Sequence, residues 1–395
     1  MTPFIGVQNR MSFDSRKIAI ATAGFCAFLN LYSPQALLPE LAGEFDVGPA
    51  TISATMTAST AAIALTAPFT GAFADVVGRK LMITGAMLLV VVPMTLIALA
   101  VDVQGMIVYR FFQGLLLPPI FAVTVAYVGD EWPTPEVPGV IGIYVMGASV
   151  GGFAGRFVPG VVADLIGWRG AFLTVAVMSL VGAALVATML PRERGFVGSE
   201  GLCASVRQML RHLGNPQLAA TCAIGFGVLF NFIAIFTYVN FHLAAPPYGF
   251  SSTLLGAVFV TYLAGAAMAL MVGWAVARFG RRRFILGVFG VWICGALLLL
   301  TQPIAAIVIG LLLCAVCGML SQAIATGYVT AIVKDGRSSA VGLYVTSFYV
   351  GGSMGALLPG ATWDAAGWPA CVAMVVVMLS LMVLIAALAY RRMEA

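Results

Sequence analysis

Long uncharged apolar runs, separated by short polar loops, dominate the chain. Twelve of them are long enough to cross about 30 Å of hydrocarbon as helices. Apolar and polar residues do not alternate within them as they would in a membrane β-barrel. The pattern predicts an all-α membrane protein with twelve transmembrane helices in two sets of six. The expected helices cover residues 18–38, 51–73, 81–101, 105–128, 138–160 and 170–190, then 218–241, 252–276, 284–301, 304–327, 339–360 and 369–390.

Composition and charge agree with this setting. Of 395 residues, 61% are hydrophobic and 9% are charged, whereas an ordinary soluble domain has about 25% charged residues. With a cytoplasmic N-terminus, the inner loops and tails hold seventeen Lys and Arg residues and the outer loops hold only Arg169. By the positive-inside rule we expect a multi-pass plasma-membrane protein, of a bacterial inner membrane, with both termini cytoplasmic. The net charge of +5 therefore reflects topology, and we expect no nucleic-acid partner.

The chain contains an internal repeat. Residues 142–168 and 342–368 are identical at 12 of 27 positions, and a weaker pair joins residues 71–80 to 273–282. Two six-helix halves of the same orientation follow, related by a pseudo-two-fold axis, with a binding site expected between them near the midplane. The predicted domains are an N-terminal bundle at 1–190, a cytoplasmic linker at 191–217 and a C-terminal bundle at 218–395. Residues 208–213 are expected to form a short amphipathic helix.

Three motifs resemble those of the major facilitator superfamily. The loop after the second predicted helix reads Gly71-x-x-x-Asp75-x-x-Gly78-Arg79-Lys80, with a degenerate copy at Gly273, Gly280, Arg281 and Arg282. The fourth predicted helix carries Arg110-x-x-Gln113-Gly114. The fifth carries Gly147 and Gly151, but Gly152 replaces the proline of the family's antiporter motif. The resemblance covers the whole chain, lies nearest the drug/proton antiporter and efflux branch, and implies that superfamily's twelve-helix fold.

The loop motif also has a physical interpretation. Gly71 and Gly78 permit close helix approach and a tight turn, while Asp75 can accept hydrogen bonds from a helix N-terminus or pair with Arg79. Such a contact, formed in one arrangement of the halves and broken in the other, would be a conformational latch. Alternatively, Arg79 and Lys80 only set the topology. The second copy has Ala277 in place of the acid, which favours the latch.

Two arginines lie within predicted helices, and no carboxylate lies well within any of them. An ionisable side chain in hydrocarbon costs about 2.5–3.5 kcal/mol on insertion scales, so Arg110 and Arg156 should face a wet cavity or a polar partner. Because a guanidinium binds carboxylate or phosphate through paired hydrogen bonds, the two would favour an anionic or zwitterionic substrate. Alternatively each binds backbone carbonyls or amides such as Gln113, and Arg156 extends towards the outer surface. Ala356 stands at the position of Arg156 in the second repeat.

In the superfamily that the chain resembles, the first, fourth, seventh and tenth helices line a central cavity. Polar and aromatic side chains there can hold an organic molecule, although each alone is equally an interhelical hydrogen bond. The candidate substrate-binding residues are Asn30, Tyr32, Arg110, Gln113, Asn231, Tyr238 and Gln322, with Arg156 of the fifth helix. Gln35, Asn240, Thr326 and Tyr328 are further lining candidates.

Resemblance and charge together predict a secondary transporter that works by alternating access, with efflux of a small organic compound and protons as the candidate exchanged ion. An importer of an organic anion and a receptor that moves nothing are the alternatives. The predicted helices hold no nucleophile–base pair, His cluster or carboxylate dyad, so we expect neither an enzyme nor a cofactor or metal site. The expected partners are a small-molecule substrate and the lipid bilayer, and the chain is expected to act as a monomer.

Overall fold

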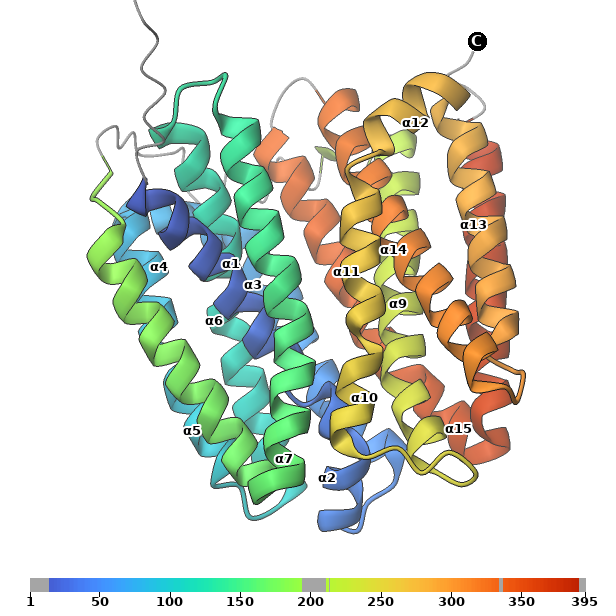
Figure 1. Cartoon of the computed structure of the whole chain (residues 1–395). Coiled ribbons are helices and arrows are strands. Elements are labelled where there is room, and N and C mark those ends of the chain that lie inside the picture. Colours follow the sequence, from blue (N-terminus) through green and yellow to red (C-terminus); the bar gives the residue numbers. More distant parts are fainter. Residues whose placement is uncertain (1–13, 194–210, 213, 334–336, 391–395) are drawn as a thin grey trace, which may run out of the picture.

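The structure, a computed structural model, describes residues 14–193, 211–212, 214–333 and 337–390 and consists mainly of helices (Figure 1). The first half holds α1 (Ser15–Tyr32), the 3₁₀ turn η1 (Gln35–Leu37), α2 (Leu38–Glu44), α3 (Pro49–Val77), α4 (Arg79–Leu89), α5 (Val91–Ala98), α6 (Val103–Glu131) and α7 (Val137–Met189). The second half holds α9 (Pro216–Ala244), α10 (Ser252–Val258), α11 (Val260–Ala269), α12 (Val272–Phe279), α13 (Arg281–Leu298), α14 (Ile304–Ile332) and α15 (Arg337–Ala389). Most of the predicted linker, including four of the six residues at 208–213, lies outside the described residues.

The described helices account for the twelve predicted crossings. Eight of the described helical segments are long and apolar enough to cross a membrane. Two of these, α7 and α15, are 53 residues long and bend at Gly167 and Gly367, so each crosses twice. The 18-residue helices α1, with Arg16 and Lys17 in its first turn, and α13, with three arginines in its first turn, complete the twelve. The all-α, twelve-helix prediction is confirmed.

Positive-φ glycines separate the helices at matching places in the two halves. Gly78 (φ 93°) divides α3 from α4 and Gly280 (φ 76°) divides α12 from α13, while Gly167 (φ 81°) and Gly367 (φ 67°) make the bends. Glycine adopts this backbone conformation without the steric cost that other residues incur. The repeat in the sequence therefore sets the same turns in each half.

Glycines also bring helices of each half into backbone contact. A Cβ added at Gly151 on α7 would collide with the backbone of Phe25 on α1, and one added at Gly351 on α15 would collide with the backbone of Phe226 on α9. Small residues at such crossings allow the close packing on which membrane helix association depends. The α1–α7 and α9–α15 crossings are thus two copies of one contact.

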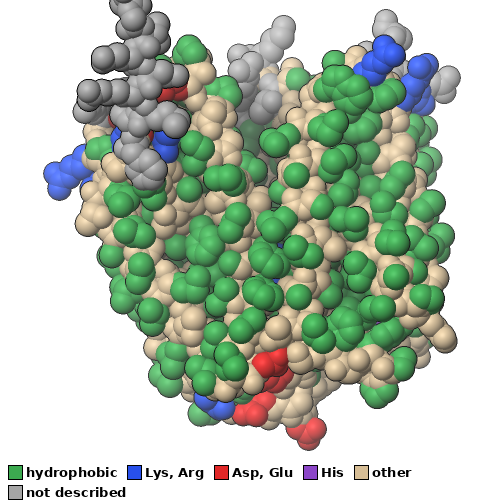
Figure 2. Space-filling view, viewed as in Figure 1, with side chains coloured by type: hydrophobic (Ala, Val, Ile, Leu, Met, Phe, Trp, Pro, Cys, Tyr) green, Lys and Arg blue, Asp and Glu red, His purple; other side chains and the backbone are tan. Residues whose placement is uncertain are grey.

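The surface has the distribution expected of a membrane protein. Apolar side chains cover the middle of the molecule, and most charged side chains gather at its two ends (Figure 2). We call the end that carries Gly78, Gly280 and Glu193 the linker end, and the end that carries Glu40, Asp102 and Gly167 the far end. In Figure 1 the linker end is at the top.

Candidate functional site

Hydrogen bonds join the two halves from the far end to mid-depth. Gln35 of η1 donates through Nε2 to Oγ1 of Thr237 on α9 (3.1 Å), and its backbone carbonyl accepts from Nδ2 of Asn240 (3.0 Å). The remaining bonds of this group are Ser252 Oγ to Glu40, Thr253 N to Asp164, Thr253 Oγ1 to the Gly160 carbonyl, Thr57 Oγ1 to the Ser353 carbonyl and Ser353 Oγ to Thr60 Oγ1. We call this group the far-end gate. These bonds hold the two halves together at that end.

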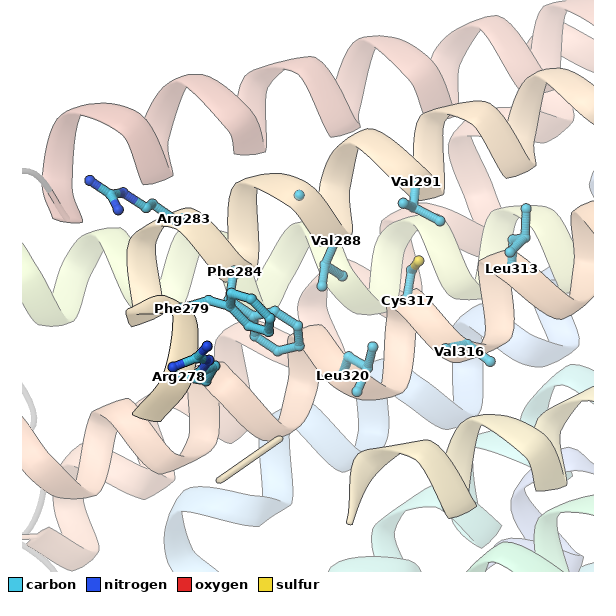
Figure 3. Close-up of a pocket in the computed structure, with 11 residues that line it drawn as sticks. Arg278, Phe279, Arg283, Phe284, Val288, Val291, Leu313, Val316, Cys317 and Leu320 are labelled. Carbon is cyan, nitrogen blue, oxygen red and sulfur yellow. The ribbon is translucent and has the colours of Figure 1, made fainter. Parts of the chain in front are cut away.

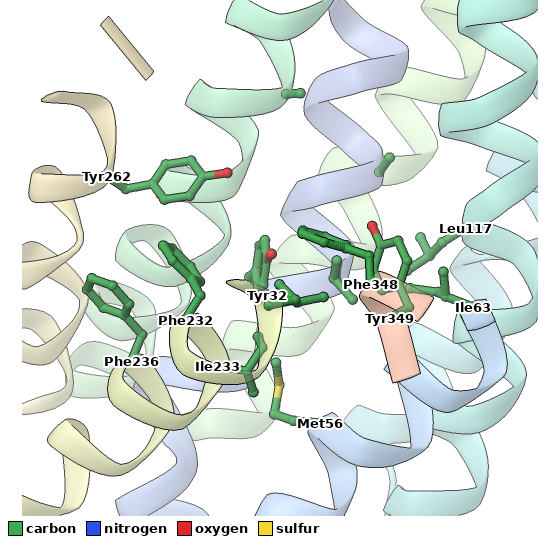
Figure 4. Packing of buried hydrophobic residues seen from close by; sticks show 14 of the residues in the cluster. Tyr32, Met56, Ile63, Leu117, Phe232, Ile233, Phe236, Tyr262, Phe348 and Tyr349 are labelled. Carbon is green, nitrogen blue, oxygen red and sulfur yellow. The ribbon is translucent and has the colours of Figure 1, made fainter. Parts of the chain in front are cut away.

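A cavity of about 50 Å³ lies between the halves on the linker side of Gln35. Its walls come from α1, α9, α11, α14 and α15. Figure 4 shows the rings of Phe232 and Tyr262 on one side of Tyr32, and those of Phe348 and Tyr349 on the other. The cavity has room for a few water molecules, whereas pockets for small organic ligands are typically about 300–1,000 Å³. In this conformation the cavity is therefore too small for an organic ligand.

Arg156 of α7 lies behind the aromatic wall. Its guanidinium carbon is 3.7 Å from the ring centre of Tyr32 and 5.3 Å from that of Tyr262, both of which line the cavity, and 4.4 Å from that of Phe259. Such cation–π contacts contribute about 2 kcal/mol each when desolvated. The wall therefore partly stabilises a positive charge beside the cavity.

The hydrogen bonds of Arg156 leave part of the guanidinium free. Nε donates to Oε1 of Gln35 and Nη1 donates to the carbonyl oxygen of Gly152, both at 2.7 Å. The side chain is fully buried, its Nη2 has no hydrogen-bond partner, and no described carboxylate forms an ion pair with it. A buried cation without an acid leaves a site that can take an anionic group.

Arg110 of α6 differs from Arg156 because protein acceptors occupy all three of its nitrogens. Nε donates to the carbonyl oxygen of Thr55 (3.3 Å) and Nη2 to that of Leu31 (2.7 Å). Nη1 donates to the carbonyl oxygen of Asn30 (3.0 Å) and to Oε1 of Gln113. This side chain is fully buried and joins α1, α3 and α6. The geometry favours a structural role for Arg110 in this conformation.

The other predicted substrate residues divide into two groups. Tyr32 and Gln322 line the cavity. The rest form bonds elsewhere: Gln113 Nε2 to Asn30 Oδ1, Asn30 Nδ2 to Ser179 Oγ, Asn231 Nδ2 to the Gly227 carbonyl and Met382 Sδ, and Tyr238 Oη to the Ala356 carbonyl. Thus Asn30 and Gln113 belong to the Arg110 network, Asn231 faces α15, and Tyr238 lies near the far-end gate.

The structure adds two residues to the predicted latch. Arg79 lies 3.7 Å (Nη2–Oδ1) from Asp75 and forms an ion pair with Asp130 of α6. The carboxylate of Glu193 accepts from the backbone nitrogens of Arg79 (2.9 Å) and Lys80 (3.3 Å), which places a negative charge at the N-terminus of α4.

The two glycines of the latch differ in how much room they leave for a side chain. A Cβ at Gly78 would lie 2.6 Å from Oε1 of Glu193, while one at Gly71 would meet open space. The contacts of Arg79 and Glu193 described above all lie within the first half.

Sequence reasoning missed most of the cavity wall. Phe28, Phe232, Tyr262, Phe348 and Tyr349 line it. Phe28 and Phe232 have no hydrogen-bonding group, and the other three lie on the eighth and eleventh predicted helices, outside the four expected to line the cavity. Phe348 and Tyr349 lie inside the repeated segment, on the helix that matches the one carrying Arg156. Their place in the repeat was the available signal.

Comparison with known proteins decides the family. The sequence profile described as Major Facilitator Superfamily matches residues 20–259 and 218–395. This chain belongs to the major facilitator superfamily. The inner membrane transport protein YnfM of Escherichia coli (strain K12) is 30% identical over 382 residues, which cover 96% of this chain and 91% of that protein. The uncharacterized MFS-type transporter YybF of Bacillus subtilis (strain 168) is 27% identical over 372 residues, covering 92% and 91%.

A solved structure shows the same fold. A bacterial homologue of the human lysosomal transporter Spinster, in an inward-facing and unoccupied conformation, matches with a TM-score of 0.78 at 15% identity, covering 96% of this chain and 98% of that one. As a superfamily member, the chain is a multi-pass membrane transporter with a small-molecule substrate. Proteins of this superfamily are in general not enzymes.

Proposed function

We propose that this chain is a secondary transporter that exports a small aromatic organic anion by alternating access, and that the cavity between the halves is its substrate site. The observation that carries the proposal is the position of Arg156, a buried cation with an unbonded Nη2 behind a wall of aromatic rings. Rings of the wall supply contact area for an aromatic body. The guanidinium supplies a charge-assisted hydrogen bond for a carboxylate or similar group.

The far-end gate supports alternating access. Gln35 binds both Arg156 of its own half and Thr237 of the other half. An anion that engages Arg156 would compete with the Oε1 atom of Gln35 for the guanidinium. Release of Gln35 would loosen its bonds to the second half, so substrate binding and opening of the gate would be coupled through one side chain.

The proposed direction follows from charge and orientation. With both termini cytoplasmic, the linker end faces the cytoplasm and the closed far end faces outwards. An inside-negative potential favours the exit of an anion by about 2.3 kcal/mol per charge per 100 mV. Export of an anion therefore gains from the membrane potential, whereas its uptake requires a coupled ion.

Protons are the proposed exchanged ion, and Glu40 is the proposed carrier. Its carboxylate accepts a hydrogen bond from Ser252 Oγ of the second half (2.8 Å). Protonation would remove the charge that strengthens this contact and would favour the open gate. The latch of Gly71, Asp75, Gly78, Arg79 and Lys80, with Asp130 and Glu193, would stabilise the other state at the linker end through contacts with the second half, since its contacts in this structure lie within the first half.

Transport assays in oriented vesicles test the proposal. Inside-out vesicles that contain the chain should take up labelled aromatic monocarboxylates, and preloaded unlabelled compound should accelerate this uptake by counterflow. Uptake confined to right-side-out vesicles would indicate import instead. Binding without counterflow would indicate a receptor. A proton gradient that drives uptake in the wild type and not in Glu40→Gln would support proton exchange.

A further inference from the structure

A larger cavity lies on the second half, among α12, α13 and α14 and separate from the substrate site (Figure 3). Its volume is about 530 Å³. We call it the α13–α14 groove. Val291 at one end is 46% exposed and Phe279 at the other is 51% exposed, so the groove opens onto the apolar surface of the bundle.

The length and lining of the groove suit a hydrocarbon chain. Val288, Val291, Leu313, Val316 and Leu320 form its walls. Along α13 it extends from Arg283 to Val291, which is about 12 Å at the helical rise of 1.5 Å per residue. One leaflet of a bilayer has a hydrocarbon depth of about 15 Å, half of the full core. The groove thus spans most of one leaflet.

Two arginines stand at the end of the groove nearest the linker end. Figure 3 shows Arg278 and Arg283 there, beside the rings of Phe279 and Phe284 and opposite the Val291 end. Both side chains are exposed, and neither forms an ion pair with any carboxylate that the structure describes.

The neighbouring arginines of α13 are engaged with the protein. Arg281 lies over the ring of Tyr328 (4.6 Å to the ring centre), and Arg282 Nη2 donates to the carbonyl oxygen of Ala387 (3.2 Å). Among the four arginines between residues 278 and 283, Arg278 and Arg283 are the two whose side chains make no hydrogen bond, ion pair or ring contact with the part of the chain that the structure describes, and these two line the groove.

We propose that the α13–α14 groove binds an anionic phospholipid of the cytoplasmic leaflet. The headgroup phosphate binds the guanidinia of Arg278 and Arg283, and one acyl chain occupies the apolar walls. Charge complementarity selects this occupant, because the cytoplasmic leaflet is rich in anionic lipids and guanidinium groups bind phosphate well. The choice of leaflet rests on the proposed orientation of the chain, but the binding site does not depend on the substrate or direction of transport.

Native mass spectrometry of the detergent-purified protein tests the site. Phosphatidylglycerol and phosphatidylcholine with the same acyl chains are titrated in parallel, and inorganic phosphate is the soluble control. The wild type should retain phosphatidylglycerol in preference, and free phosphate should not compete at equal concentration. The double variant Arg278→Gln/Arg283→Gln should weaken the phosphatidylglycerol adduct about 10- to 30-fold, given the typical contribution of each cation near a membrane surface.

A matched charge control is Arg192→Gln/Arg211→Gln, which removes two exposed cations outside the groove. Equal effects of the two double variants, or equal retention of the two lipids by the wild type, would overturn the proposal. A protein dimer in place of a lipid adduct would assign the groove to a second copy of the chain.

Filling the groove provides an independent test. A Cβ at Gly287 or at Gly290 of α13 would meet open space, but only Gly287 lines the groove. Gly287→Phe should reduce lipid retention at least tenfold while leaving the melting temperature close to that of Gly290→Phe. Equal lipid retention in the two variants would contradict the site even if the arginine variants behaved as expected.

Discussion

The two halves of the bundle share one frame but differ in their buried polar groups. Helices α6 and α14 each have 29 residues, and in this register Leu311 and Cys314 stand where α6 has Arg110 and Gln113. In the repeated segment Ala356 stands where α7 has Arg156. The second half instead supplies aromatic rings to the cavity.

This difference distinguishes the residues that build the fold from those that give the buried site its charge. Repeated glycines fix the turns and the close helix crossings in both halves, whereas the buried cations among the described residues, Arg110 and Arg156, both lie in the first half. The two halves therefore adopt the same helix arrangement without sharing a buried arginine at the matching positions. Of the residues that break the repeat, Arg110 and Gln113 are occupied by protein partners, whereas Arg156 keeps an unbonded nitrogen and is the better candidate for substrate recognition.

The largest effects should come from the shared crossings. Gly151→Leu and Gly351→Leu should each destabilise the protein by about 3 kcal/mol or more, because the new side chain collides with the backbone of the neighbouring helix. Thermal unfolding in detergent measures the loss. Gly142→Leu is the control on α7, since a Cβ there meets open space. Stability as high in Gly151→Leu as in Gly142→Leu would show that α1 and α7 do not pack this closely.

The next largest effect should be a difference between substitutions at matching positions of the two halves. Arg110→Gln removes the donors that serve the carbonyls of Thr55, Leu31 and Asn30, and should cost about 2–4 kcal/mol, since each buried acceptor left unpaired costs about 1–3 kcal/mol. Leu311→Met at the matching position should cost less than about 1.5 kcal/mol. Denaturation of both variants gives the comparison. Equal losses would mean that Arg110 adds nothing beyond packing.

The loop motif should show a smaller difference. Glu193→Ala removes the carboxylate at the N-terminus of α4 and should cost about 1 kcal/mol and slow transport. The exposed Glu136, whose side chain makes no capping bond at α7, is the control as Glu136→Ala. Vesicle transport rates and melting temperatures provide both readouts. Indistinguishable behaviour of the two variants would remove Glu193 from the latch.

The smallest effect concerns pH. Hydrogen bonds from Arg16 lower the pKa of the Asp14 carboxyl, which caps α1, whereas the uncharged Asn215 caps α9. A lowered pKa in the folded state means that the stabilisation is complete above the unfolded value of about 3.9 and is lost as pH falls through the folded value. Asp14→Asn should therefore reduce stability at pH 7 by less than about 1 kcal/mol. The difference should vanish at the lowest pH, and a constant difference would contradict this account.

Sequence predicted the fold well because hydropathy and glycine repeats are local signals. The predicted helix at 105–128 corresponds to α6, Val103–Glu131. The predicted helix at 252–276 is divided at Phe259 and Met271 into three segments. Hydropathy does not reveal these two breaks, because the residues around them are as apolar as the rest of the helix.

The site was harder to predict for a physical reason. An aromatic residue in an apolar run looks the same whether it faces lipid or a cavity, so Tyr262 and Phe232 were not identified. Backbone carbonyls, which satisfy Arg110, leave no trace in the sequence. Glu193 and Asp130 meet Arg79 only through tertiary contact, and no motif spacing joins them.

The role of Arg156 is tested most directly by comparing an aromatic carboxylate that shows counterflow with its neutral amide. The affinity for the carboxylate relative to that for the amide should fall about 10- to 100-fold in Arg156→Gln, because a hydrogen bond to a charged group contributes about 1.5–3 kcal/mol. Arg156→Lys should give an intermediate ratio, since the planar donor geometry is lost. An unchanged affinity ratio in Arg156→Gln would contradict the assignment of the substrate charge to Arg156. Efflux of a permanently cationic aromatic dye by the wild type, at the same rate in Arg156→Gln, would contradict it as well.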